Sequence, residues 1–122
     1  MIYLAVCGAA AFGALARYLT GVVMQKLTRG STAGTLMANV LGSLLAGCVA
    51  GAVIAWGLPA AWQVIISAGF LGAYTTFSSW MVEAASYLRN DDLVKMVLYV
   101  LGSTIVGTAA AAAGLVGMVY LA

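Results

Sequence analysis

Hydrophobic residues run along the chain in long stretches that only a few charged positions interrupt. The middle stretch carries no charge between Gly30 and Val82, which is too long for one membrane span, and the only proline, Pro59, marks a turn that divides it. A membrane-spanning helix needs about 20 apolar residues. The pattern therefore predicts four transmembrane helices, at about residues 3–24, 32–56, 60–88 and 93–121.

The composition supports a membrane protein with a single domain over residues 1–122. Hydrophobic residues make up 65% of the chain and charged residues only 7%, whereas a soluble domain carries about 25% charged residues. Four such helices enclose little interior, so we expect an oligomer. A net charge of +2 is too small for a nucleic-acid partner. Histidine is absent, and no nucleophile–base pair or metal cluster is visible, which argues against an enzyme.

Small residues recur at helical spacing. Ser43, Gly47 and Gly51 form a ladder on the second predicted helix, and an Ala/Gly run covers residues 107–117 on the fourth. Ladders of this kind let helices approach closely in lipid. Trp56 and Trp62 flank the turn at Pro59, where they suit the membrane interface.

Polar side chains at mid-membrane depth are the first candidates for function. They are uncharged and lie on three helices. Thr35, Asn39 and Ser43 share one face of the second, and Tyr99 and Ser103 share a face of the fourth, with Thr104 and Thr108 on a neighbouring face. Thr75, Thr76, Ser78 and Ser79 crowd together about halfway along the third. All of these groups can donate a hydrogen bond. Neutral donors suit an anion and offer nothing to a proton relay. The alternative is that they only join helices to one another.

The third predicted helix contains a weak point. Gly69, Gly72, Thr75 and Thr76 are poor helix formers in close succession, and a break there would free carbonyls that are able to bind a cation. Phe77 and Trp80 follow at i, i+3. Their ring edges are electropositive and suit an anion path, although the spacing also fits plain packing.

Arg17 and Glu83 are the charged residues nearest the polar groups, and each lies near the end of a predicted helix. Both suit a water-filled vestibule. The alternative is that Arg17 reaches the headgroups and that Glu83 is hydrated.

Three segments in register resemble the Fluc (CrcB) family of fluoride channels. They are GALARY at residues 13–18, GTLMANVLGS at 34–43 and GFLGAYTTFSSW at 69–80. The resemblance covers essentially the whole chain. It implies an all-α protein of the bacterial inner membrane, with four transmembrane helices, a break in the third, and two fluoride pores at the interface of an antiparallel, dual-topology dimer.

The resemblance also implies roles for individual residues. Those implied to line the fluoride pore are Asn39, Phe77, Ser78, Tyr99 and Ser103, to which the shared helix face adds Thr35, while Arg17 and Glu83 are implied to be vestibule charges. The backbone carbonyls of Gly72 and Thr75, from both subunits, are implied to hold a structural sodium ion. Fluoride would leave the cell passively. A pore that replaces the hydration water of the ion with hydrogen-bond donors needs no ATP or other energy source.

The sequence departs from the family pattern in three ways. Trp80 stands where a second pore phenylalanine is expected. On the fourth helix, Gly107 and Ala111 continue the face of Tyr99 and Ser103, so the polar track looks shortened. Four cations lie on one side of the four-helix arrangement, which the positive-inside rule would place in the cytoplasm; they are Lys26, Arg29, Arg89 and Lys95.

These departures keep alternatives open. The chain fits an antiparallel homodimer, or one half of a heterodimer with a paired relative in which this half does not conduct. A small multidrug-resistance-type transporter has the same size, but that class couples to protons through a carboxylate in its first helix, where this chain has only Arg17.

Overall fold

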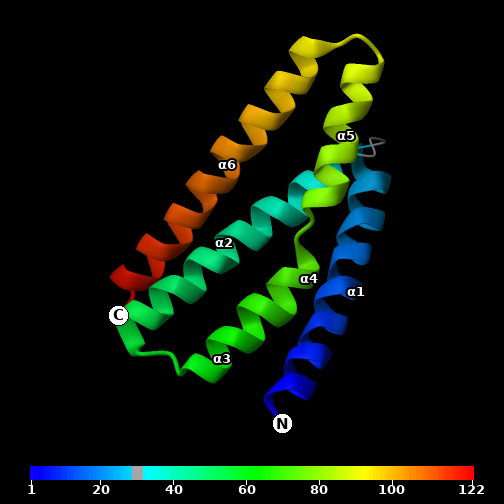
Figure 1. Cartoon of the computed structure of the whole chain (residues 1–122). Helices are drawn as coiled ribbons and strands as arrows, with labels where there is room; N and C mark the ends of the chain where they lie inside the picture. Colours follow the sequence, from blue (N-terminus) through cyan, green and yellow to red (C-terminus); the bar gives the residue numbers. More distant parts are fainter. Residues whose placement is uncertain (29–31) are drawn as a thin grey trace.

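The computed structural model describes residues 1–28 and 32–122, and within them the chain is helical with no strand (Figure 1). The elements are α1 (Ile2–Thr28), α2 (Thr32–Trp56), α3 (Ala60–Val64), the π-helical η1 (Ile65–Leu71), α4 (Gly72–Tyr74), α5 (Phe77–Arg89) and α6 (Leu93–Tyr120). Among the described residues, three helices are long and apolar enough to cross a membrane: α1, α2 and α6.

The first helix runs one turn further than the sequence predicts. α1 continues to Thr28, so Gln25 and Lys26, expected in a loop, are helical. The prediction was wrong because residues 24–27 are all good helix formers. The Thr28 hydroxyl also donates to the Met24 carbonyl at 2.7 Å. The rest of the expected loop, Arg29 and Gly30, lies outside the described residues.

The third predicted helix is divided, as the weak helix formers indicated. α3 starts after Pro59, whose carbonyl accepts from the amides of Trp62 and Gln63 at 3.0 and 3.1 Å. The helix continues through η1 and α4, and two residues then leave it: Thr75 has φ −84° and ψ 160°, and Thr76 has φ −148° and ψ 120°. α5 resumes at Phe77 and extends away from the other helices alongside α6 (Figure 1).

The small-residue ladder brings α2 and α6 into close contact (Figure 1). A Cβ atom on Gly47 would lie 1.9 Å from the Ala111 carbonyl oxygen, and one on Gly114 would lie 2.2 Å from that of Leu44. No larger side chain fits at either position without moving the backbone. The close crossing places the polar face of α2 beside that of α6.

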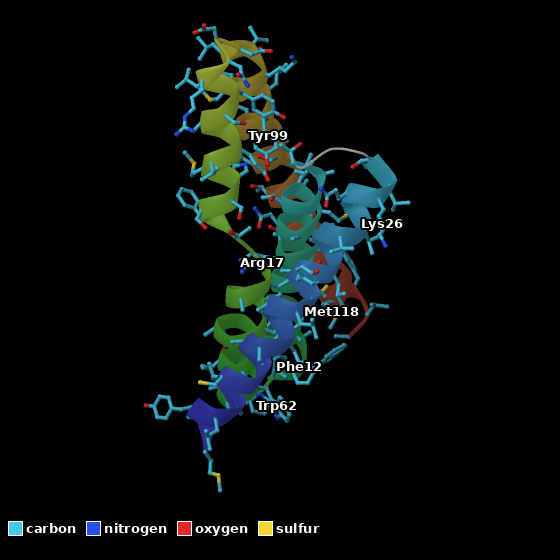
Figure 2. All side chains as sticks on the ribbon, turned by 90° about the vertical axis from the view of Figure 1, so that its right-hand side faces the viewer. Phe12, Arg17, Lys26, Trp62, Tyr99 and Met118 are labelled. Carbon is cyan, nitrogen blue, oxygen red and sulfur yellow. The ribbon has the colours of Figure 1, made fainter. Side chains whose placement is uncertain are left out.

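The described part of the chain buries few side chains. Its hydrophobic core consists of Ala38, Ala52, Leu71, Tyr74 and Ala84, while large apolar side chains such as Phe12 are exposed (Figure 2). Contiguous apolar surface of this extent needs lipid or another protein to cover it.

Candidate functional site

The side chain of Asn39 forms hydrogen bonds with the backbone at the break between α4 and α5. The Thr76 amide donates to Asn39 Oδ1 at 2.8 Å, and Asn39 Nδ2 donates back to the Thr76 carbonyl at 3.0 Å. The Thr76 hydroxyl accepts from the Ser79 amide at 3.3 Å and so caps the first turn of α5. α2 therefore satisfies both backbone groups of Thr76, which the break would otherwise leave unpaired.

The same arrangement frees carbonyl groups at the break. In an uninterrupted helix the Thr76 amide would bond to the Gly72 carbonyl, but here it bonds to Asn39. The Thr75 carbonyl accepts from Arg17 Nη1 at 3.3 Å. Each carbonyl oxygen has two lone pairs, so Thr75 keeps acceptor capacity as well.

A cavity of about 460 Å³ opens beside the break, between α2, α5 and α6. Uncharged side chains and backbone line it. Its walls are Asn39, Gly42, Ser43 and Ala46 of α2; Leu71, Gly72, Thr75 and Thr76 at the break; Phe77 and Trp80 of α5; and Ser103, Thr104, Gly107 and Thr108 of α6. The cavity thus combines hydroxyl and amide donors with two aromatic rings and contains no charged side chain.

The two aromatic residues differ in their polar contacts. The rings of Phe77 and Trp80 have centroids 5.6 Å apart and are tilted by 57°. Phe77 is 71% exposed, whereas the Trp80 indole N–H donates to the Ser103 hydroxyl oxygen at 2.8 Å. This hydrogen bond crosses the cavity from α5 to α6.

A second polar cluster surrounds Glu83, the only acidic residue outside the loop at residues 90–92. Its carboxylate accepts from the Thr35 hydroxyl at 2.6 Å and from the Tyr99 hydroxyl. The Tyr99 ring also packs edge-on against Tyr87, with centroids 5.7 Å apart. Figure 2 shows Tyr99 where α5 and α6 run together, beyond the break.

The candidate residues from the sequence lie in different places in the structure. Asn39, Gly72, Thr75, Phe77, Trp80 and Ser103 line the same cavity. Thr35 and Tyr99 instead each donate to Glu83. Ser78 is exposed and lies 3.3 Å from the Thr76 hydroxyl.

Arg17 occupies a separate position. It lines a smaller cavity of about 300 Å³ with Tyr18, Gly21, Val22 and Gln25. In Figure 2 it lies at mid-height, close to the break, and it reaches the Thr75 carbonyl. Arg17 therefore contacts the backbone at the break, in addition to the vestibule role that the sequence suggested for it.

Four hydroxyl residues line the cavity beyond those assigned from the sequence to the pore or to the sodium site: Ser43, Thr76, Thr104 and Thr108. Thr104 and Thr108 lie one position after Ser103 and Gly107, so the polar wall of α6 continues where the face of Tyr99 and Ser103 alone appeared to end. On the face of Tyr99 and Ser103, Gly107 lines the cavity without a hydroxyl, while Thr104 and Thr108 add hydroxyls from the neighbouring face. The i, i+4 spacing of Thr104 and Thr108 was the signal for this extension.

Together, the fold and the cavity define an all-α membrane protein with a donor-lined cavity beside a broken helix. The model of one protein family, described as "CrcB-like protein, Camphor Resistance (CrcB)", matches residues 4–115. The chain belongs to this family, as the three sequence segments indicated, and it is a multi-pass protein of a bacterial membrane.

Similar proteins carry a functional name. A protein of Nitrobacter winogradskyi named "Fluoride-specific ion channel FluC" is 36% identical over 114 residues, which cover 92% of this chain and 90% of that protein. A Methylobacterium protein with the same name is 40% identical over 106 residues, covering 86% and 85%. A third, from Prosthecochloris aestuarii, is 36% identical over 102 residues, covering 82% and 80%.

Proposed function

We propose that this chain is a fluoride-selective passive ion channel of the bacterial inner membrane, which lets cytoplasmic fluoride leave the cell. The names of its relatives give the class of transport. The observation that carries the proposal is the 460 Å³ cavity, whose polar lining consists of neutral donors and carries no charge.

Neutral donors suit a small, strongly hydrated anion. A pore has to replace the water of such an ion with hydrogen bonds while holding it weakly enough to release it. A fixed cation would trap the ion, and a carboxylate would repel it. Asn39 and Thr108 supply donor groups along the cavity, and the edge of the Phe77 ring adds a weakly positive surface. Ser78 adds a hydroxyl beside Phe77, whereas Thr35 and Tyr99 donate to the Glu83 carboxylate and would face fluoride only after leaving it.

An antiparallel homodimer would complete the pore. Phe77 is 71% exposed, and Leu101 and Ile105 on α6 are 56% and 67% exposed. A second copy, inverted in the membrane, would cover these side chains and close the open side of the cavity. Because the two-fold symmetry of the dimer repeats the cavity, the single interface would contain two pores, with Arg17 and Glu83 in the approaches to them.

A structural sodium ion fits the break. Sodium is a hard cation and prefers oxygen ligands, as calcium and magnesium do. The Gly72 carbonyl has lost its helical partner, and both it and the Thr75 carbonyl belong to residues that line the cavity. One chain supplies two such oxygens, so a complete shell needs the same pair from a second subunit. The ion would join the two breaks electrostatically.

Flux through purified protein tests the proposal. Liposomes that contain the protein alone should release fluoride rapidly and retain chloride. Phe77→Ile should abolish fluoride release, while Phe12→Ile, which removes an aromatic ring that is 70% exposed on α1, should leave it unchanged. Release of chloride together with fluoride, or equal losses in the two variants, would exclude a selective pore at this cavity.

A heterodimer half is the second candidate. Trp80 in the cavity and the one-sided cations favour it, because a chain with a single orientation needs an oppositely oriented partner. Well-folded protein that releases no fluoride alone, but does so with a paired relative, would support this candidate. Epitope tags that find both orientations from a single gene would support the homodimer.

A further inference from the structure

Trp80 brings a donor into the cavity at a position where the family pattern leads us to expect only a ring edge. Its indole N–H lies 2.8 Å from the Ser103 hydroxyl oxygen, and both residues line the 460 Å³ cavity. An indole nitrogen only donates. The hydrogen bond therefore aims a permanent donor across the proposed pore toward α6.

The Ser103 hydroxyl donates its own proton to a carbonyl of its own helix, α6. Its oxygen lies 2.6 Å from the Tyr99 carbonyl and 3.1 Å from the Val100 carbonyl, and it donates within α6. A hydroxyl has a single proton, so toward Trp80 the Ser103 oxygen acts only as an acceptor. Of this pair, the indole N–H is the group that can turn to an anion without first breaking a hydrogen bond inside a helix.

We propose that the Trp80 indole N–H binds fluoride directly, exchanging the Ser103 oxygen for the anion as the ion passes. This inference rests on the proposed channel function. A hydrogen bond to an anion is shorter and stronger than one to a neutral hydroxyl, so fluoride displaces Ser103. The exchange leaves no unpaired group, because Ser103 keeps its bond to the helix carbonyl. Fluoride would then sit beside the indole N–H in the cavity that the Phe77 ring also lines.

The indole N–H can be observed directly. The chain has three tryptophans, which give three indole signals in a 15N–1H spectrum of the detergent-solubilised protein, and Trp80→Phe assigns the signal that disappears. Sodium fluoride should move the Trp80 signal in a saturable way. It should leave Trp56 and Trp62, which lie at the turn between α2 and α3, in place, and sodium chloride at equal strength should move none of them.

Two substitutions separate the donor from the ring. Trp80→Phe keeps an aromatic edge but removes the N–H, and it should raise the half-saturating fluoride concentration of the flux about tenfold, because hydrogen bonds to charged groups are worth at least one decade of affinity. Ser103→Ala removes the competing acceptor and should shift fluoride binding at the indole in the opposite direction, toward lower concentrations.

The outcomes distinguish the inference from the channel function. Selective fluoride flux with a Trp80 signal that ignores fluoride, or that moves equally with chloride, would overturn the inference and leave the channel standing. A wild-type protein without flux would remove the self-sufficient channel, and the Trp80 signal would still decide whether the indole binds the anion.

Discussion

Asn39 and Thr76 exchange two hydrogen bonds across the gap between α2 and the break, at 3.0 and 2.8 Å. The carboxamide of Asn39 thus pairs with both the N–H and the C=O of one peptide residue. It replaces the partners that an unbroken helix would supply, in a place where water is scarce and an unpaired backbone group is costly. The two hydrogen bonds from Asn39 therefore stabilise the broken conformation of the backbone at Thr76.

The Asn39–Thr76 pair predicts a strong effect of Asn39→Asp. The carboxylate still accepts from the Thr76 amide, but it loses the donor and places a negative charge against the Thr76 carbonyl. We expect a loss of about 1–3 kcal/mol in the free energy of unfolding, together with a lower fluoride flux. Denaturation in detergent and liposome flux measure the two effects. Asn90→Asp, at an exposed position after α5, is the control, and equal effects at both positions would contradict the role of the pair.

The break itself could be predicted from the sequence because its cause is local. Gly69, Gly72, Thr75 and Thr76 weaken the helix within eight consecutive residues, and Thr76 is a residue type that caps helices. The helix periodicity also placed Thr35 and Asn39 on one face. These are properties of neighbours in the chain, which a single sequence contains.

The partners of these groups could not be predicted in the same way. Asn39 meets a backbone group 37 residues away, and Thr35 meets Glu83 at a separation of 48 residues. Such pairs depend on where helices cross, and the crossing depends on close approaches such as that of Gly47 to Ala111. The spacing of Trp80 likewise showed its face but could not show that its N–H would reach Ser103.

The start of α6 predicts a limited dependence of stability on pH. Asp92 Oδ1 accepts from the Lys95 amide at 3.0 Å, and its Oδ2 lies 2.7 Å from Lys95 Nζ. These hydrogen bonds, the one from the Lys95 side chain first, hold the pKa of Asp92 below its ordinary value of 3.8. A lowered folded-state pKa adds stability above the unfolded pKa, and this stability is lost as the pH falls through the folded value.

Asp92→Asn tests this dependence, because asparagine still caps the helix but does not titrate. The melting temperature of the wild type should exceed that of the variant at pH 7 and approach it below about pH 4. Asp91→Asn neutralises the neighbouring exposed carboxylate and serves as the control. A difference between wild type and Asp92→Asn that stays constant from pH 7 to pH 3 would contradict the prediction.

Gly42 predicts how tightly the break is packed. A Cβ atom there would lie 2.2 Å from Thr75 Cγ2, and the Thr75 hydroxyl is bonded to the Leu71 carbonyl at 2.9 Å. Gly42→Ala should therefore displace Thr75 and its carbonyl and weaken the proposed stabilisation of the protein by sodium relative to potassium. Melting temperatures in the two salts measure this. Gly8→Ala, which has nothing within 4 Å of its added carbon, should keep the full sodium effect.

The cluster at Glu83 predicts non-additive losses. Thr35 and Tyr99 donate to the same carboxylate from α2 and α6. When one donor is removed, the remaining hydrogen bond therefore contributes more to the stabilisation of the charged carboxylate. Thr35→Val and Tyr99→Phe should each cost about 1.5–3 kcal/mol in the free energy of unfolding. The double variant should lose at least about 0.5 kcal/mol more than their sum, because it leaves the carboxylate without either donor.

Thr104→Val is the control for that cycle. The Thr104 hydroxyl donates to the Val100 carbonyl of its own helix at 2.7 Å, and that carbonyl keeps its bonds within α6 when the hydroxyl is removed. Its loss should cost less than either single change at the Glu83 cluster and should add to the Tyr99→Phe loss without coupling. Strict additivity of Thr35→Val and Tyr99→Phe would mean that the two hydroxyls act independently, and that Glu83 does not join α2 to α6 through a shared charge.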